Sequence, residues 1–359
     1  MADSSKNKLP VWKRVFNAIA ICIGFLLFFS ILALGVVMYC NSPPMGYPQA
    51  VPGITLEASD TVLLEIRKGE TARSVGMRLE EAGLIRSRYF WAFINRVQKE
   101  FIKSGNYRLY VPVSQLAIHR TLVSGKQVLS RITIPEGVTL KKAAQIFEDN
   151  GICPAADFLE AARDKEIIDF YKIPGNTLEG YLFPDTYFFP AEYPAHRVIQ
   201  TMAGTFFEKL KVIEPEALVM EPMELYRRVI VASIVEREYR QKEEAALMTG
   251  VFFNRLNIGM ALQSCATVEY VITEIQGRPH PEVLYNRDLE IRDPYNTYLV
   301  PGLPPGPISS PGATALYASF NPQKSDYLYF RLTDPVRGMH YFSRTLDDHI
   351  KAGLLYLKN

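Results

Sequence analysis

The longest apolar stretch of the chain lies near its N-terminus. Residues 18–38 hold no charged side chain over 21 positions, which is enough helix to cross a hydrocarbon core of about 30 Å. Basic residues precede it between positions 6 and 14, and the next Lys or Arg is Arg67. Because basic residues mark cytoplasmic flanks, we predict a cytoplasmic tail over 1–17 and an uncleaved transmembrane helix over 18–39. The remainder would then lie outside the cytoplasmic (inner) membrane.

A segment without hydrophobic periodicity follows this helix. Residues 40–60 are rich in Pro, Gly and Ser, which favours extended or turn conformations over regular elements. We therefore predict a semi-extended linker between the membrane and the first folded region.

The next pattern occurs twice, with an offset of 68 residues. The first copy contains residues 66–71 (IRKGET) and 79–84 (LEEAGL), and the second contains 134–139 (IPEGVT) and 147–152 (FEDNGI). Each copy predicts a short strand, a glycine turn, a threonine that caps a helix, and a helix that ends at a glycine.

This strand-turn-helix unit resembles half of a LysM module, and we expect LysM-like α/β subdomains over 61–153. The resemblance implies binding of glycans that contain N-acetylglucosamine. A repeated packing unit that binds nothing explains the pattern equally well.

Residues 227–240 (RRVIVASIVEREYR) combine an apolar run with an acidic end. The composition favours a helix over a strand. Helical geometry then places Glu238 on the face of Val231 and Val235, and Glu236 about 200° away. A carboxyl group beside apolar side chains has a raised pKa, as a general acid requires. A solvated helix end is the alternative interpretation.

Composition narrows the class of protein. The chain has 359 residues, 48% hydrophobic and 22% charged, with a net charge of +2, which gives no reason to expect nucleic acid as a partner. Five scattered His and four Cys form no metal-ligand spacing, so we expect no metal and no other cofactor. Cys153 and Cys265 lie outside the anchor region, and a single bridge between them is a hypothesis.

Residues 178–187 (LEGYLFPDTY) interleave aromatic side chains with Gly, Pro and acids. Such a segment can form a wall that stacks on sugar rings, because aromatic rings cover apolar faces. It can equally be a core strand and turn.

Six ordered motifs resemble the YceG-like (MltG) endolytic murein transglycosylases. They are residues 178–187, 232–239 (ASIVEREY), 251–256 (VFFNRL), 259–264 (GMALQS), 295–312 (YNTYLVPGLPPGPISSPG) and 327–330 (YLYF), the last followed by His340 and Phe342. The resemblance implies an α+β fold, with a catalytic domain over 154–359. It also implies cleavage of the β-1,4 bond between N-acetylmuramic acid and N-acetylglucosamine in nascent peptidoglycan strands, which leaves a 1,6-anhydro end and terminates elongation.

One carboxyl group can perform that reaction, first as acid and then as base. Lytic enzymes of the lysozyme type carry their acid in an Ala-Ile-x-x-x-Glu-Ser context, and alignment with residues 232–238 indicates Glu238 as the catalytic residue. Relatives usually continue Glu-Thr, whereas this chain has Tyr239. Glu236 remains the second candidate.

The loop after the catalytic segment departs from the family pattern. Relatives usually read Gln-Thr/Ser-Asp-Pro-Thr-Val, and this chain has Gln263, Ser264, Cys265 and Ala266 at the first four positions. Loss of the Asp removes a hydrogen-bond acceptor, and loss of the Pro loosens the turn. Gln263 is kept and suits a sugar amide, although a turn-capping role explains it equally well.

A second predicted binding segment precedes a proline-rich run. Tyr295, Asn296 and Tyr298 suit recognition of hydroxyl and N-acetyl groups, and the prolines that follow favour a stiff surface connection. Glycan strands and the membrane are the expected partners, and enzymes of cell-wall synthesis are candidate protein partners.

Two other functions compete with this interpretation. The altered loop favours a membrane-anchored scaffold that binds peptidoglycan without cleaving it. A glycosidase that uses water would need a second acid, such as Glu269 or Asp288, at about 6.5–9.5 Å from the first if it inverts.

Overall fold

The computed structural model describes residues 11–46, 48–58 and 61–356, and the chain forms two compact units. Unit 1 is Met1–Val128 and unit 2 is Leu129–Asn359. Both units combine helices with small antiparallel sheets, as expected for an α+β protein. The second repeat copy, which we expected to group with the first over 61–153, lies within unit 2.

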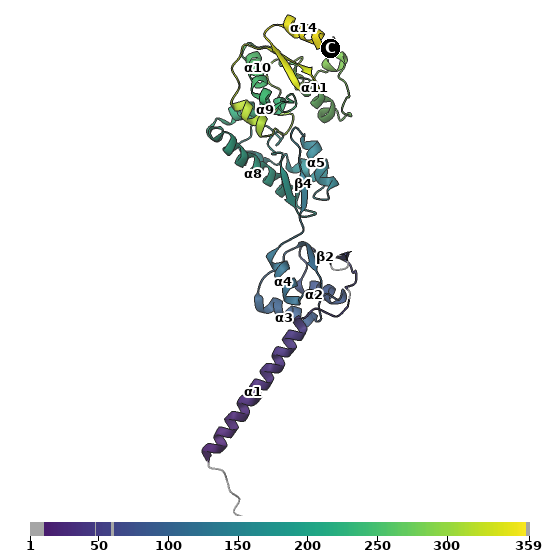
Figure 1. Cartoon of the computed structure of the whole chain (residues 1–359), viewed down its shortest axis with the longest axis vertical. Coiled ribbons are helices and arrows are strands. Elements are labelled where there is room, and N and C mark those ends of the chain that lie inside the picture. The colour runs from purple at the N-terminus through teal and green to yellow at the C-terminus, as the bar shows by residue number, and fades with distance from the viewer. Residues whose placement is uncertain (1–10, 47, 59–60, 357–359) are drawn as a thin grey trace, which may run out of the picture. The chain divides into compact units, whose positions relative to one another are not determined.

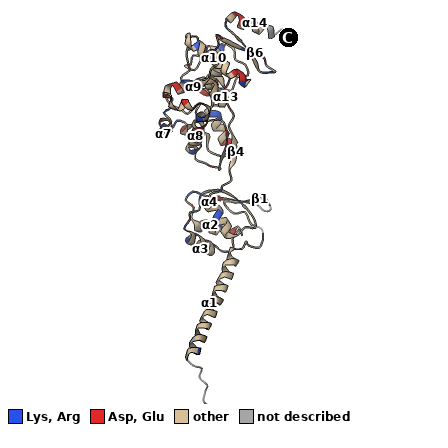
Figure 2. Cartoon of the chain, turned by 60° about the vertical axis from the view of Figure 1, so that its left-hand side comes forward, with Lys and Arg blue, Asp and Glu red and all other residues tan. Residues whose placement is uncertain are grey.

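The N-terminal helix α1 (Val11–Asn41) contains the apolar run. Residues Ile19–Asn41 have a mean hydropathy of 2.8 and are long enough to cross a membrane. Figure 2 shows that α1 carries almost no charged residue beyond its first turn. Part of the predicted cytoplasmic tail, with Lys6 and Lys8, lies outside the described residues.

Unit 1 is built around a three-stranded antiparallel sheet in the order β1-β2-β3. The central strand β2 buries Val62, Leu64 and Ile66 against Trp91 and Tyr107. Its other elements are β1 (Ile54–Ala58), β2 (Thr61–Ile66), α2 (Ala72–Glu81), α3 (Arg88–Gln98), β3 (Gly105–Tyr110) and α4 (Gln115–Ser124).

The segment predicted as a linker is part of this unit. Residues 54–58 form β1, and the backbone N–H of Gln49 donates to the carbonyl of Ala82. Nearer α1, the Arg86 guanidinium donates to the carbonyl of Pro43. The described part of 40–60 is therefore attached to unit 1 at several points, and its last residues belong to the sheet of that unit.

Unit 2 is mainly helical and contains two small two-stranded sheets, β4-β5 and β6-β7. In chain order its longer elements are β4 (Ser130–Thr133), α5 (Leu140–Asp149), α6 (Ala155–Ala161), α7 (Lys165–Phe170), β5 (Thr186–Phe189), α8 (Ala195–Ile213), α9 (Pro222–Val235), α10 (Ala245–Asn257), α11 (Cys265–Tyr270), α12 (Asn286–Leu289), α13 (Ala313–Phe320), β6 (Tyr329–Asp334), β7 (Met339–Ser343) and α14 (Leu346–Tyr356). Short 3-10 helices η1 (Pro215–Val219) and η2 (Lys242–Glu244) flank α9, and the π-helical turn η3 (Val271–Ile275) extends α11.

Helix α9 is the centre of unit 2. Its last seven residues, 229–235, are all buried, because α9 packs against α10 and α13 (Figures 1 and 2). A helix that is apolar on all sides is stable only inside a protein. The two acidic residues Glu236 and Glu238 therefore follow directly after the buried end of α9.

The aromatic segment 178–187 also belongs to this core. Tyr181, Phe183 and Tyr187 are buried, and Tyr181 packs on Phe206 with ring centroids 5.1 Å apart. The sugar-stacking interpretation of this segment is wrong, since these rings have no free face to offer a ligand.

Candidate active site

The helix that carries the candidate acids ends earlier than predicted. Helix α9 stops at Val235, and residues 236–238 form a turn in which the N–H of Glu238 donates to the carbonyl of Val235. The predicted helix through Arg240 is therefore wrong. Hydrogen bonds from distant segments to the Glu236 and Glu238 side chains compete with a further helical turn.

Glu238 lies on the wall of a cavity of about 580 Å³ in unit 2. Helix α10, the segment 262–265 and the hairpin β6-β7 supply most of the other walls. Among the described residues that line this cavity, Glu238 is the sole carboxylic acid. Several hydrogen-bonding side chains share the cavity with it: Arg255, Gln263, Ser264, Tyr298 and His340.

The environment of Glu238 favours its protonated form. Burial raises the pKa of this carboxyl group to about 7, and the nearby Glu269 carboxylate raises it further, against the lowering effects of Ser264 and Arg237. The Ser264 hydroxyl donates to Oε1 of Glu238 at 2.5 Å. A carboxyl group with a pKa near neutrality can both donate and accept a proton at physiological pH.

The loop that carries Ser264 is held in an unusual conformation. Gln263 has a φ of +51°, in the left-handed region, and its N–H donates to the carbonyl of Thr297. The N–H of Ser264 donates to the Thr297 hydroxyl at 3.1 Å. These two bonds hold the loop against the segment of Thr297 without the proline of the family pattern.

Arg255 fastens the same loop from α10. Its guanidinium donates to the carbonyl of Leu262 at 2.7 Å and to the carbonyl of Leu328. It is nearly fully buried, and the backbone carbonyls that it binds stabilise its charge. Arg255 thus connects the loop to Leu328, the residue that precedes β6.

Gln263 and Tyr298 are the predicted binding residues that the structure brings to Glu238. The Tyr298 hydroxyl lies 3.1 Å from Sγ of Cys265, and burial raises the pKa values of both groups. Cys265 therefore stands at the cavity wall in the position where relatives usually have Asp.

Asn296 is a correction to the predicted site. It is fully buried, and its amide donates to the carbonyls of Leu289 and Ile291. Its Oδ1 accepts the N–H of Tyr298 at 3.0 Å. Asn296 has no group left for substrate, and it positions Tyr298.

Tyr295 lies elsewhere in unit 2. Its ring packs against Tyr270 with centroids 5.0 Å apart, and it does not line the cavity around Glu238. Tyr295 is therefore not placed to contact a substrate bound beside Glu238.

Glu236 and Glu238 have separate surroundings. Oε2 of Glu236 accepts the N–H of Gly312 at 2.8 Å, and Oε1 accepts the Tyr239 hydroxyl at 3.2 Å. Burial, with the Glu136 carboxylate as a smaller cause, raises the pKa of Glu236 to about 7. Its contacts connect α9 to the segment before α13, and it does not line the cavity.

The candidate second acids also lie outside the cavity. Glu269 binds the Arg237 guanidinium at 2.8 Å, and Asp288 is buried with its carboxylate on the N–H of Tyr285. Sequence reasoning missed Ser264 as a partner of Glu238, because no local signal joins residues 26 positions apart. Cys153 and Cys265 are both free, so the proposed bridge is absent.

Comparison with known proteins gives one family and several relatives. The model of the YceG-like family matches residues 64–353. A Streptococcus pneumoniae protein named endolytic murein transglycosylase is 29% identical over 92% of this chain, which covers only 64% of the length of that relative. A Bacillus subtilis protein of the same name is 29% identical over 84% of this chain and 87% of its own length. The crystal structure of a yceG-like protein from Listeria monocytogenes is 31% identical, with a TM-score of 0.54 over 81% of this chain and 99% of that protein.

Proposed function

The chain belongs to the YceG-like family, and we propose that it is an endolytic murein transglycosylase. Its substrate would be the β-1,4 bond between N-acetylmuramic acid and N-acetylglucosamine in nascent glycan strands. The product would carry a 1,6-anhydro end, and cleavage would terminate elongation. Relatives over most of the chain carry the name of this activity.

The main support for the proposal is that Glu238 is the sole carboxylic acid among the described residues that line the cavity. Glu238 is half-buried, desolvation raises its pKa to about 7, and the Ser264 hydroxyl holds Oε1 in place. Hydrolysis by the usual pair of carboxylates requires a second acid near the first. Glu269 and Asp288 are engaged elsewhere, which favours intramolecular attack over attack by water.

The reaction conserves one proton on Glu238. The protonated carboxyl group donates to the glycosidic oxygen as the bond from that oxygen to C1 of N-acetylmuramic acid breaks. The C6 hydroxyl of the same sugar attacks C1, and the Glu238 carboxylate takes the hydroxyl proton. One C–O bond is broken and one is formed, and the enzyme returns to its protonated state.

Other cavity residues would bind and orient the strand. Gln263 presents an amide that suits an N-acetyl group, and Tyr298 presents a hydroxyl and a ring. Ser264 is a positioning residue, since its hydroxyl orients the carboxyl group of Glu238. Asn296 would not touch the strand, and it positions Tyr298 by accepting the backbone N–H of that residue.

The cellular setting belongs to the proposal. Helix α1 would cross the cytoplasmic membrane once, with its basic flank inside and both units outside. The partners would be peptidoglycan strands and enzymes of cell-wall synthesis, and we expect no nucleic acid. LysM-like binding of glycan by the repeat copies also stays a proposal.

The alternative function is a membrane-anchored scaffold that binds peptidoglycan without cleaving it. Cys265 and Ala266, where relatives usually have Asp and Pro, favour it. In an active enzyme, C265D combined with A266P should raise turnover if the missing Asp takes part in chemistry. An unchanged rate would assign the loop a structural role.

Mass spectrometry of products from the full chain and glycan strands tests the function. We expect anhydro-muropeptides from the unmodified protein. Glu238→Gln should lower the rate by about 10²–10⁴-fold, because the amide cannot transfer the proton. Glu236→Gln is the matched control, and it should cost less than about tenfold because Glu236 lies outside the cavity.

Two results would contradict the proposal. Binding to sacculi without any anhydro product would indicate the scaffold. Products with a reducing end, formed by addition of water, would indicate a glycosidase.

The rate should also fall as pH rises through about 7, since Glu238 must be protonated to begin the reaction.

A further inference from the structure

Helix α3 of unit 1 has an apolar face that no described part of the unit covers. Its inner face is buried through Trp91 and Ile94. On the opposite face, Tyr89, Phe93 and Val97 are 74%, 57% and 60% exposed. Their spacing of four residues places them in one row along the helix, and we name this row the α3 stripe.

The start of α3 is bonded to the end of the membrane-spanning helix. The Arg86 guanidinium stacks on the Tyr39 ring at 4.7 Å and donates to the carbonyl of Pro43 at 2.8 Å. It also donates to the hydroxyl of Ser42 at 3.0 Å. Ser87, the next residue, is the N-cap of α3.

A second connection joins α1 to the neighbouring helix. Oδ1 of Asn41 accepts the N–H of Leu116 in the first turn of α4, and the Gln115 amide donates to the carbonyl of Ser87. The end of α1 and the starts of α3 and α4 therefore form one bonded cluster. In both Figure 1 and Figure 2, α3 lies at the end of unit 1 that is nearest to α1.

The length of the apolar run places this cluster at the membrane surface. Residues Ile19–Asn41 span about 34 Å as a helix, against a hydrocarbon core of about 30 Å. Tyr39 and Arg86 would thus lie at the level of the headgroups, where aromatic and basic side chains are enriched. No flexible linker separates α3 from that level.

The chemistry of α3 matches this location. Residues 88–103 contain four basic side chains and one acidic one: Arg88, Arg96, Lys99 and Lys103 against Glu100. Basic residues beside an exposed aromatic and aliphatic row are typical of helices that lie in a lipid interface. The positive charge complements anionic headgroups.

We propose that the α3 stripe inserts into the headgroup region of the membrane that α1 crosses. Unit 1 would then be held at the surface by two attachments, α1 and α3. The proposal depends on α1 spanning a membrane and is independent of the catalytic activity. It goes beyond the single helical anchor by assigning a second lipid contact to the folded part of the chain.

Depth measurement with spin labels tests it in the full chain. The protein, with its own four cysteines replaced by serine, is reconstituted into vesicles of zwitterionic and anionic phospholipid. Phe93→Cys carries the label in one sample, and Lys68→Cys carries it in the matched control. Lys68 is exposed in the turn after Ile66. Thr61, at the other end of β2, pairs with Tyr110, and the residues after Tyr110 line a pocket with Pro43 and Pro44, which follow α1. Lys68 therefore lies at the end of β2 that is away from α1.

The expected result is a clear difference between the two sites. The label at position 93 should be accessible to oxygen and shielded from an aqueous nickel chelate, at a depth of about 5–10 Å. The label at position 68 should show the opposite pattern. Replacing Arg96 and Lys99 by glutamate should reduce the depth at position 93, most in anionic vesicles.

Two results would overturn the proposal. Equal aqueous accessibility at positions 93 and 68 would show that the stripe faces water. Shielding at 93 that disappears on dilution with lipid, with dipolar broadening between labels, would show that a second copy covers the stripe. Thermal unfolding of each labelled protein verifies that the exposed substitutions leave unit 1 folded.

Discussion

The two copies of the strand-turn-helix repeat have the same local structure and different surroundings. Thr71 and Thr139 each cap a helix by accepting the N–H of the residue three positions on. In both copies the turn glycine and the glycine after the helix have positive φ, namely Gly69, Gly83, Gly137 and Gly151. The predicted local elements of the repeat are confirmed.

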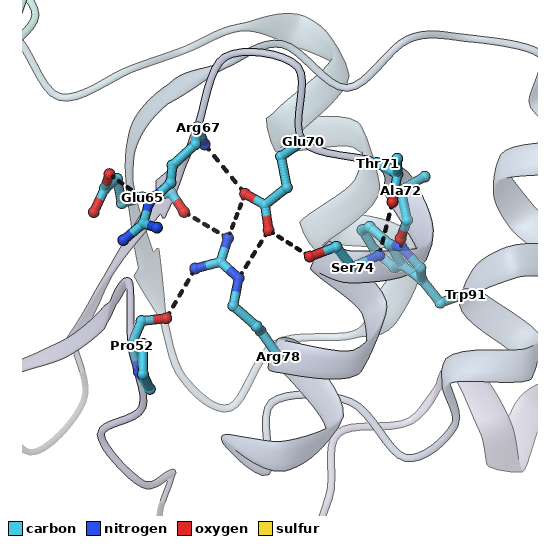
Figure 3. Close-up of polar contacts among 9 residues, drawn as sticks. All are labelled: Pro52, Glu65, Arg67, Glu70, Thr71, Ala72, Ser74, Arg78 and Trp91. Atoms are coloured by element: carbon cyan, nitrogen blue, oxygen red, sulfur yellow. Dashed lines mark hydrogen bonds and ion pairs between the residues drawn. The ribbon is translucent and has the colours of Figure 1, made fainter.

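The first copy closes on itself through an ion pair. Figure 3 shows the Glu70 carboxylate between the turn and the Arg78 guanidinium, with a shortest distance of 2.7 Å. Glu70 also accepts the N–H of Arg67 and the hydroxyl of Ser74. Arg78 donates in addition to the carbonyl of Glu65. The turn, strand and helix of this copy therefore form one self-contained polar cluster.

The second copy has apolar residues at the two matching positions, Val138 and Ile146. Its turn is closed by other segments of unit 2. The N–H of Gly137 donates to the carbonyl of Ser310, and the N–H of Ser310 donates to the carbonyl of Val138. The helix start is closed by Glu179, whose carboxyl group accepts the N–H of Leu140 at 3.1 Å.

This difference separates the two copies, since the first is contained in unit 1 and the second is joined to the surroundings of the candidate site. The first copy satisfies its own polar groups, so its turn needs no partner from another segment. A copy whose turn depends on Ser310 is joined to the segment whose Gly312 binds Glu236.

The largest effect should come from Glu179. Burial raises its pKa from an ordinary 4.5 to about 8, so the folded state holds a proton that the unfolded state releases. The contribution of Glu179 to the stability of unit 2 should be greatest below about pH 4.5 and should fall by a few kcal/mol as pH rises to about 8. In Glu179→Gln, hydrogen exchange of unit 2 should show a much weaker pH dependence. An unchanged slope would assign the dependence to Glu236 and Glu238.

The next effect concerns the ion pair of the first copy. Arg78→Ala should lower the stability of unit 1 by about 3 kcal/mol, because it leaves the Glu70 carboxylate largely buried without its partner. Hydrogen exchange should show the loss in unit 1 and leave unit 2 unchanged. Arg67→Ala is the control, and removal of this exposed side chain should cost about 1 kcal/mol or less.

A smaller effect should follow from a matched small residue in the two helices. A methyl group added at Gly76 would lie 2.5 Å from Cδ1 of the Trp91 ring, so Gly76→Ala should cost about 1–3 kcal/mol through overpacking. The matching position in the second copy is Ala144, which is fully buried. Ala144→Gly should cost about 1 kcal/mol, measured by chemical denaturation. A stabilising Gly76→Ala would contradict the packing described for Trp91.

The smallest effect on stability should come from the turn glycines. Gly69→Ala and Gly137→Ala should each cost about 1 kcal/mol, because both have φ near +80°. Only Gly137→Ala should also lower activity, since this turn contacts the Glu236 side chain and binds Ser310. The loss should stay below the roughly 100-fold that a 1 Å misplacement costs. Equal activities of the two variants would contradict the link between the second copy and the active site.

Part of the candidate site could be predicted because its signals are carried by residue type and order. Glu238, Gln263 and Tyr298 come together in one cavity, as the family motifs implied. The roles of Asn296 and Tyr295 could not be read in the same way. An asparagine in a loop suits a sugar or a backbone carbonyl equally, and only the fold shows that Leu289 and Ile291 occupy its amide.

The sequence by itself determined the elements whose causes are local. A threonine cap, a glycine with positive φ and a long apolar helix depend on neighbouring residues, so they can be predicted without a fold. Tertiary structure decided the end of α9 at Val235, the incorporation of residues 54–58 into a sheet, and the unit to which the second repeat belongs. Each of these depends on hydrogen bonds between segments far apart in the chain. Such bonds compete with local preferences of similar strength, and only the folded chain determines which of them form.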